Sequence, residues 1–193
     1  ISTFPLFAAF FSHLMIKGDQ LTLLRTLGLA IAFSGTSLIV MRRGGLSVEE
    51  FSAWGAAIVL VSAMLLGLRL ILSAQMVRQT EPTRVVVWMM ILALWAFMLG
   101  GLIFEEIRWE NLDWPPLVGI LYQGVVIAGF GFMAMGLIYK FYSPTLVSSF
   151  GFIAPVCGVL LSAWLLQEPL TWSIAIGTVC VGVGLVLIAI SKV

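Results

Sequence analysis

Long stretches without charged residues constrain the fold of this chain more than any other feature of its sequence. Seven stretches contain no Asp, Glu, Lys or Arg: 1–16, 26–41, 51–68, 85–104, 114–139, 141–167 and 169–191. A helix that spans a bilayer needs about 20 mainly apolar residues, with a range of about 17–25. The stretches are apolar throughout, whereas barrel strands would alternate over segments of about ten residues. The sequence therefore predicts an all-α, polytopic membrane helix bundle.

Extending these stretches toward their flanking charges gives seven expected helices. They are residues 1–17, 22–41, 53–77, 84–104, 115–141, 145–167 and 171–191. The composition agrees, because 61% of the 193 residues are hydrophobic and 10% are charged. Soluble domains have about 45–50% apolar and about 25% charged residues. A soluble core of this length could not bury so much apolar surface, so lipid is an expected partner.

Positive charges divide unevenly between the two sides of the expected bundle. If the helices alternate in direction, one side carries Lys17, Arg25, Arg78, Arg84, Lys140 and Lys192, with Asp19 and Glu81. The other side carries three arginines and seven acidic residues. Lys and Arg concentrate in cytoplasmic loops, so we expect a multi-pass protein of the cell membrane with a cytoplasmic C-terminus. Four tryptophans fall at the expected outer helix ends, where such rings prefer to lie: Trp54, Trp109, Trp114 and Trp172.

The first two expected helices resemble the last two at an offset of 149 residues. The matched positions are Asp19 with Glu168, Leu21 with Leu170, Thr22 with Thr171, Gly28 with Gly177 and Gly35 with Gly184. The charge distribution places the first acidic turn inside and the second outside, so the two copies have opposite orientations. Inverted repeats are typical of secondary transporters, which bind their solute near the bilayer midplane between the repeats.

The two acidic turns resemble those of EamA-type transporters in the drug/metabolite transporter superfamily, whose usual pattern is Gly-Glu-x-Leu-Thr. They read Gly18-Asp19-Gln20-Leu21-Thr22 and Gln167-Glu168-Pro169-Leu170-Thr171. The first has Asp in place of Glu, and the second has Gln in place of Gly. The resemblance implies ten helices in two inverted five-helix repeats. Residues 1–41 would then be the last two helices of the first repeat and 53–193 the complete second repeat, in a chain truncated at its N-terminus to seven helices.

The resemblance also implies a function. It is secondary transport of a small metabolite or drug-like solute across the cell membrane by alternating access, without a cofactor. A membrane channel or a non-transporting membrane scaffold remains the alternative, and a homodimer is left open. The formal net charge of +1 implies no attraction to nucleic acid.

Enzymatic and metal-dependent functions fit the sequence poorly. A retinal protein needs a lysine within its last helix, but Lys17, Lys140 and Lys192 all lie at helix ends. The chain has one histidine, His13, so no His cluster can bind zinc and no Ser–His pair is evident. We therefore expect neither an enzyme nor a metal site.

Three polar residues within the expected helices are candidates for binding the solute: His13, Arg69 and Gln123. Ionisable residues at membrane depth are costly, and this makes them functional candidates. We hypothesise that Arg69 faces the central cavity and favours a solute with a carboxylate or phosphate, with snorkelling toward the interface as the alternative. Gln123 lines the cavity or packs against a neighbour. His13 lies near the inner interface, where a structural role is the alternative.

The acidic turns and the glycines have mainly structural interpretations. Asp19 and Glu168 are expected to accept hydrogen bonds from N–H groups of the helix that follows each turn, with a gate or ion site as the functional alternative. Thr22 and Thr171 are expected N-caps. Small-residue pairs let helix backbones approach closely. The expected packing pairs of the last helices in each half are Gly28 with Ala32 and Thr178 with Gly182, with transport hinges as the alternative. Gly124 and Ala128 form a similar pair, but the glycines of residues 115–141 could either open a cavity or allow close packing.

Overall fold

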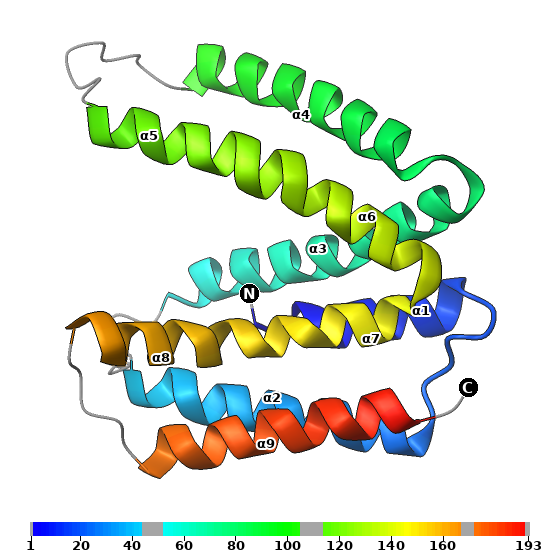
Figure 1. The fold of residues 1–193 in the computed structure, drawn as a ribbon, viewed down its shortest axis with the longest axis vertical. Coiled ribbons are helices and arrows are strands. Elements are labelled where there is room, and N and C mark those ends of the chain that lie inside the picture. The colour runs from blue at the N-terminus through cyan, green and yellow to red at the C-terminus, as the bar shows by residue number, and fades with distance from the viewer. Residues whose placement is uncertain (1, 44–51, 105–113, 167–171, 192–193) are drawn as a thin grey trace. The chain divides into compact units, whose positions relative to one another are not determined.

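A computed structural model describes residues 2–43, 52–104, 114–166 and 172–191, and these residues are almost entirely helical (Figure 1). The helices are α1 (Phe4–Met15), α2 (Leu23–Arg43), α3 (Ala53–Gln79), α4 (Pro82–Phe104), α5 (Trp114–Tyr122), α6 (Phe132–Phe141), α7 (Pro144–Ser149), α8 (Ile153–Leu166) and α9 (Trp172–Ile190). Among these described residues, six spans are long and apolar enough to cross a membrane. The all-α polytopic fold is therefore confirmed, and the expected helix ends shift by only a few residues.

Two of the spans are irregular in their middle. A π-helix, η3 (Gln123–Gly131), joins α5 to α6, so that Trp114–Phe141 forms one span of 28 residues. A short 3₁₀ segment, η4 (Phe150–Phe152), joins α7 to α8. The hydroxyl of Thr36 on α2 lies 3.5 Å from the carbonyl oxygen of Phe152 and donates to it. The carbonyl group of Phe152 therefore has a side-chain partner at the point where the 3₁₀ segment interrupts the regular α-helical hydrogen bonds.

The chain forms two compact units, residues 1–72 with 142–193 (unit 1) and residues 73–141 (unit 2). This division cuts across the segments 1–41 and 53–193 that the sequence repeat defines. The reason is that α7, α8 and α9 pack with α1 and α2 inside unit 1.

Helices α2 and α9 of unit 1 pack against each other through four glycines (Figure 1). A Cβ atom added at Gly28 would lie 2.7 Å from the carbonyl oxygen of Gly184, and one added at Gly184 would lie 2.5 Å from that of Gly28. Gly35 and Gly177 stand in the same reciprocal relation, at 2.6 and 2.8 Å. The residue order of these contacts makes the two helices antiparallel.

The glycine contacts test the expected packing pairs. Gly28 and Ala32 do pack, because a Cβ added at Gly184 would meet the backbone nitrogen of Ala32 at 2.7 Å. The pair Thr178–Gly182 was the wrong prediction for α9, since no described atom outside the helix lies within 4 Å of a Cβ at Gly182. Gly177 and Gly184 face α2 instead. They lie seven residues apart, close to two helical turns, and so share one face of α9.

A hydrophobic core surrounds this helix pair. Its buried members come from α1, α2, η4, α8 and α9: Ala9, Leu29, Ala32, Ile39, Phe152, Val156, Val159, Val181 and Ile188. A second cluster joins Ala8 and Ile16 to Ile71 of α3. There Gly67 allows close approach, since its Cβ would lie 2.8 Å from the nitrogen of Ala8. Unit 1 is thus held together by apolar packing on both sides of α1.

Unit 2 is packed more sparsely. Gly136 of α6 lies against Pro82 of α4, where an added Cβ would be 3.2 Å from the proline Cβ. The guanidinium Nε of Arg78 donates to the carbonyl oxygen of Tyr139 at 3.4 Å. No residue of α5 or η3 is buried. Within unit 2, Gly124 has no described atom outside its own helix within 4 Å of an added Cβ.

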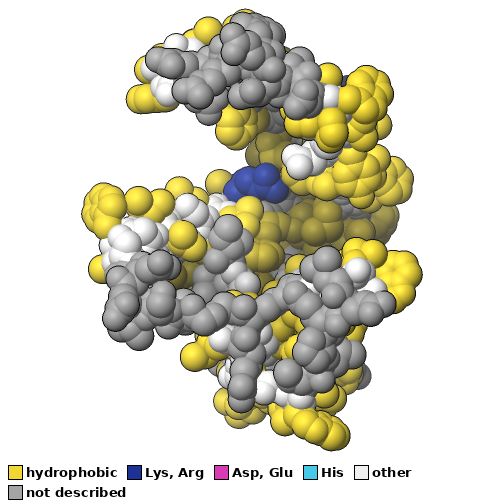
Figure 2. Space-filling view, turned by 90° about the vertical axis from the view of Figure 1, so that its left-hand side faces the viewer, with side chains coloured by type: hydrophobic (Ala, Val, Ile, Leu, Met, Phe, Trp, Pro, Cys, Tyr) yellow, Lys and Arg dark blue, Asp and Glu magenta, His cyan; other side chains and the backbone are white. Residues whose placement is uncertain are grey.

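The exposed surface is that of a membrane protein. Hydrophobic side chains dominate the described atoms on the face shown in Figure 2, with a small basic patch. Trp54, Trp114 and Trp172 lie at the first turns of α3, α5 and α9 and are 78%, 76% and 86% exposed. Trp109 lies outside the described residues. Exposed indole rings at helix ends suit the interfacial zone of a bilayer.

Candidate functional site: a buried polar cluster

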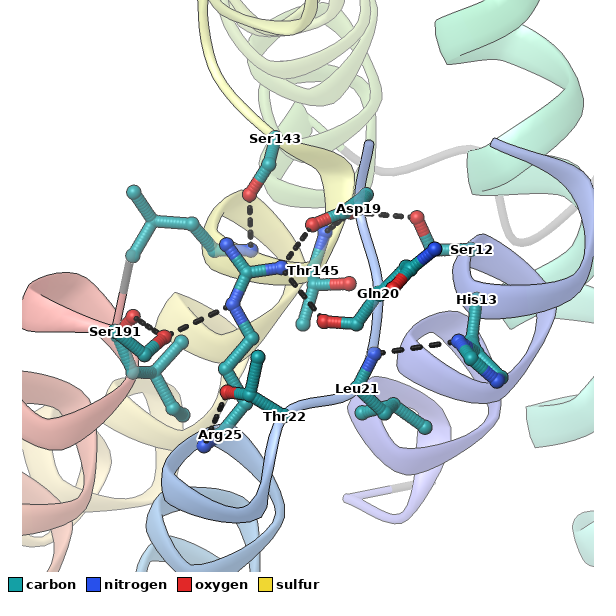
Figure 3. A network of polar contacts seen from close by, with 12 residues as sticks. Ser12, His13, Asp19, Gln20, Leu21, Thr22, Arg25, Ser143, Thr145 and Ser191 are labelled. Atoms are coloured by element: carbon teal, nitrogen blue, oxygen red, sulfur yellow. Dashed lines mark hydrogen bonds and ion pairs between the residues drawn. The ribbon is translucent and has the colours of Figure 1, made fainter. Parts of the chain in front are cut away.

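Five polar residues meet at one end of unit 1, where α1, α2, α7 and α9 begin or end (Figure 3). We call this set the polar cluster: Ser12, Asp19, Arg25, Thr145 and Ser191. Asp19 and Arg25 are only 2% and 4% exposed. A buried ion pair in so apolar a protein is costly to form, because both charges must leave water. The cluster is therefore the strongest concentration of polar chemistry among the described residues.

The turn between α1 and α2 presents Asp19 to this cluster. Gly18 has a φ angle of +92°, a conformation that side-chain-bearing residues rarely adopt. The amide of Asp19 then donates to the carbonyl oxygen of Ile16 at 3.3 Å. Thr22 accepts a hydrogen bond on its Oγ1 from the amide of Arg25 at 3.3 Å, which is the N-cap geometry expected for α2. The local Gly-Asp-x-Leu-Thr pattern thus sets the turn and starts the next helix.

The carboxylate of Asp19 has partners from three elements. Its Oδ2 accepts from the Ser12 hydroxyl at 2.6 Å and from the Thr145 amide at 3.0 Å. Its Oδ1 forms an ion pair with Nη1 of Arg25. A single side chain in a loop therefore joins α1, α2 and α7.

The guanidinium of Arg25 extends the cluster to α9. Nη1 donates to the carbonyl oxygen of Gln20 at 3.2 Å, and Nε donates to the Ser191 hydroxyl at 2.9 Å. Ser191 in turn donates to the carbonyl oxygen of Ile188 at 2.7 Å. Carbonyl groups at a helix C-terminus lack intrahelical partners. The hydroxyl of Ser191 therefore links Arg25 to the last turn of α9.

The expected role of Asp19 needs a correction. Asp19 was expected to accept from N–H groups at the start of α2, but its backbone donor is Thr145 at the start of α7. Ser143 caps α7 locally by accepting from the amide of Leu146 at 3.3 Å. The start of α7 thus has two acceptors, one local and one distant, and a carboxylate there is favoured by the helix dipole. The equivalent residues Glu168 and Thr171 lie outside the described residues.

The surroundings of Asp19 stabilise its charged form. Burial by itself would raise the pKa of this carboxyl group. The hydrogen bonds from the Ser12 hydroxyl and the Thr145 amide, together with the positive charge of Arg25, outweigh burial and hold the pKa of Asp19 below its usual value. The ion pair is therefore fully charged at neutral pH.

The three residues predicted to bind solute lie outside the polar cluster. His13 is exposed on α1, and its Nδ1 accepts from the amide of Leu21 at 3.3 Å, which supports the turn next to Asp19. Arg69 is exposed on the part of α3 that belongs to unit 1. Gln123 is exposed at the first position of η3, in unit 2.

Sequence patterns alone did not predict the polar cluster. Asp19 and Arg25 are close in sequence and of opposite charge, which was a usable signal for the ion pair. Thr145 and Ser191 lie 126 and 166 residues from their partners. No periodicity connects positions so far apart, so their convergence follows only from the packed fold.

These features define a class of protein, namely a polytopic α-helical membrane protein with a glycine-packed helix pair and a buried polar cluster at one end of that pair. The sequence model of the EamA-like transporter family matches residues 53–190. The chain belongs to this family and is therefore a multi-pass membrane transporter. No curated protein and no solved structure matches the chain.

Proposed function

We propose that this protein is a secondary transporter that moves a small metabolite or drug-like solute by alternating access. The family match over residues 53–190 is the observation that carries the proposal. The matched stretch nearly coincides with 53–193, the segment proposed as one five-helix repeat. The reciprocal contacts of Gly28 with Gly184 and of Gly35 with Gly177 support an inverted repeat. Sequence equivalence pairs Gly28 with Gly177 and Gly35 with Gly184, so each contact is the image of the other about a local two-fold axis.

The transport proposal is tested by solute counterflow. The full-length protein in proteoliposomes loaded with unlabelled solute should accumulate the same labelled solute transiently, across a panel of metabolite classes. A carrier gives this overshoot because inward and outward movement share one site. Conductive flux without an overshoot for any solute would favour the channel alternative, and the absence of any flux would favour the scaffold.

The proposed orientation places the C-terminus in the cytoplasm. The junctions α1–α2 and α6–α7 and the end of α9, which the charge count assigns to one side, meet at the polar cluster of unit 1. The convergence of these three chain segments supports the assignment of their charges to one side of the membrane, but it does not identify that side as the cytoplasmic one. A cysteine placed at Asn111 should react with an impermeant thiol reagent added outside intact cells, and one placed at Thr80 should not. The opposite pattern would reverse the orientation.

We also propose that Arg69 favours an anionic solute. Helix α3 continues to Gln79, so Arg69 lies ten residues from that end, or about 15 Å at 1.5 Å per residue. A charge at that depth costs at least about 2.5–3.5 kcal/mol on insertion scales. A solute carboxylate or phosphate would offset part of this cost. Gln123 and His13 are weaker candidates, since neither carries a permanent charge.

The Arg69 proposal predicts a difference between two variants. Arg69→Gln removes the charge and should lower uptake of an anionic solute by at least about tenfold, whereas Arg69→Lys keeps the charge and should retain part of the uptake. Uptake is measured in proteoliposomes at equal protein content. Normal transport by both variants would mean that Arg69 only snorkels to the interface.

A further inference from the structure

We propose that the hydrogen bond from the Thr145 amide to the Asp19 carboxylate, which the ion pair with Arg25 orients, is a releasable latch that keeps one end of unit 1 closed to water, and that its opening is a step of the transport cycle. The proposal rests on the proposed function, because only a carrier needs an end that closes and reopens. It assigns to the polar cluster a role beyond holding a turn.

The polar cluster excludes water from this end of unit 1, because its five residues are buried. Ser12, Asp19, Arg25 and Thr145 are all at most 4% exposed, and Ser191 is 7% exposed. The hydrogen bonds run between helix ends and not through the helix middles (Figure 3). Separation of the ends would therefore break polar contacts first.

Besides the apolar core, two kinds of contact join the helices of unit 1, and only one of them is suited to reversible opening. Helices α2 and α9 approach so closely at their glycines that their backbones fit with no side chain between them. By contrast, Asp19 and α7 are joined by a hydrogen bond from the Thr145 amide. That bond, together with the packing of α1 against α7 beside it, can open while the α2–α9 pair stays intact.

A hydrogen bond to a buried ion pair is energetically suited to such a latch. Burying Asp19 and Arg25 costs desolvation energy that is recovered when water enters, so the closed and hydrated arrangements can have similar free energies. Opening an apolar contact would instead cost about 25 cal/mol for every Å² of apolar surface newly exposed to water. The Asp19 carboxylate, once hydrated, would exchange the Thr145 amide for water and keep its ion pair with Arg25, at little net loss. The cluster can therefore exclude water when closed without preventing the open state.

Thiol labelling of one reporter position tests the latch. Ser148 is 2% exposed, lies one helical turn beyond Thr145, and its hydroxyl donates to the carbonyl oxygen of Thr145 at 3.1 Å. In the full-length protein with Cys157 and Cys180 replaced by Ala, Ser148→Cys is the reporter. Nanodiscs expose both faces to a polar thiol reagent, so the result does not depend on membrane orientation.

The latch predicts that Asp19→Asn, which removes the charge at nearly constant shape, raises the labelling rate of the reporter by about tenfold. Arg25→Gln should give a similar increase, and the double variant should add little to either, because both act on one contact. The matched control is Glu81→Gln. It breaks the exposed Glu81–Arg84 pair, which is 3.5 Å long with side chains more than 70% exposed, and should leave the rate within twofold.

Unchanged labelling in a folded Asp19→Asn protein would overturn the latch. If that variant does not fold, Ser12→Ala decides, because it removes a hydrogen bond to the carboxylate oxygen that Thr145 contacts and keeps the ion pair. A two- to threefold rise then supports the latch, and no rise overturns it. Counterflow by the protein without these variants is measured separately. A protein that shows counterflow but no response of the reporter would keep its transport function and lose the latch.

Discussion

Glycine has different structural roles in two regions of this protein, the α2–α9 helix pair and the span from α5 to α6. In the α2–α9 pair, Gly28, Gly35, Gly177 and Gly184 lie where an added Cβ would come within 2.5–2.8 Å of the opposite backbone. In the span from α5 through η3 to α6, Gly119 and Gly124 have no described atom outside their own helix within 4 Å. The comparison teaches that a glycine count does not predict helix packing, because the neighbour decides the role.

The second span suggests what its glycines do instead. Gly129 and Gly131 lie within the π-helix, where a Cβ atom added at either would lie 3.5 Å from the carbonyl oxygen five residues earlier. π-helical turns are rare, and those that occur are often found at functional sites. Glycine removes side-chain bulk and adds backbone freedom where the helix widens. We therefore expect the α2–α9 pair to be sensitive to added volume and the η3 span to be tolerant.

The largest expected effect comes from a large side chain in the tight pair. Gly184→Leu would drive the Leu side chain into the backbone of Gly28 and Ala32, and it should destabilise the protein by about 3 kcal/mol or more. Thermal unfolding in detergent and yield after size exclusion measure the loss. The control is Gly182→Leu on the same helix, where the space is open. Equal losses would show that α9 tolerates bulk nowhere, and the contrast between its faces would fail.

A smaller change compares the two spans directly. Gly177→Ala adds one methyl group 2.8 Å from the carbonyl oxygen of Gly35 and 2.5 Å from Cγ1 of Ile39, and should cost about 1–3 kcal/mol. Gly124→Ala adds the same group to open space and should stay within about 0.5 kcal/mol. The unfolding midpoints of the two variants report the difference. A loss at Gly124 as large as that at Gly177 would imply packing around η3 that this account lacks.

The smallest expected effect concerns pH. Because the pKa of Asp19 is lowered in the folded protein, its stabilising contribution is complete above the unfolded pKa of about 3.9 and is lost as pH falls through the lower folded value. The difference in unfolding midpoint between the unaltered protein and Asp19→Asn should stay constant from pH 8 to 6 and shrink below about pH 4. A difference that changes between pH 8 and 6 would contradict the charged state assigned to Asp19.

The sequence predicted some features of this structure well and others poorly. Charge-free stretches predict spans because no charge can sit cheaply in lipid, and each of the seven expected ranges contains a helix. The Thr22 cap was also predictable, since its partner lies three residues away. The contact of Asp19 with Thr145 was not, because local patterns carry no information on partners 126 residues apart. The choice of Gly177 over Gly182 likewise depends on which face α2 covers.

A double-mutant cycle tests the reciprocal α2–α9 contact, which is the central claim, most directly. Gly28→Ala and Gly184→Ala strain the same contact, so the first should push the helices apart and lower the cost of the second. We predict a coupling free energy above about 0.5 kcal/mol for that pair. Gly28 and Gly177 lie at contacts about 10 Å apart along α2, seven residues at 1.5 Å each, and should be additive within about 0.5 kcal/mol. Additivity for Gly28 with Gly184, or equal coupling for Gly28 with Gly177, would contradict the account.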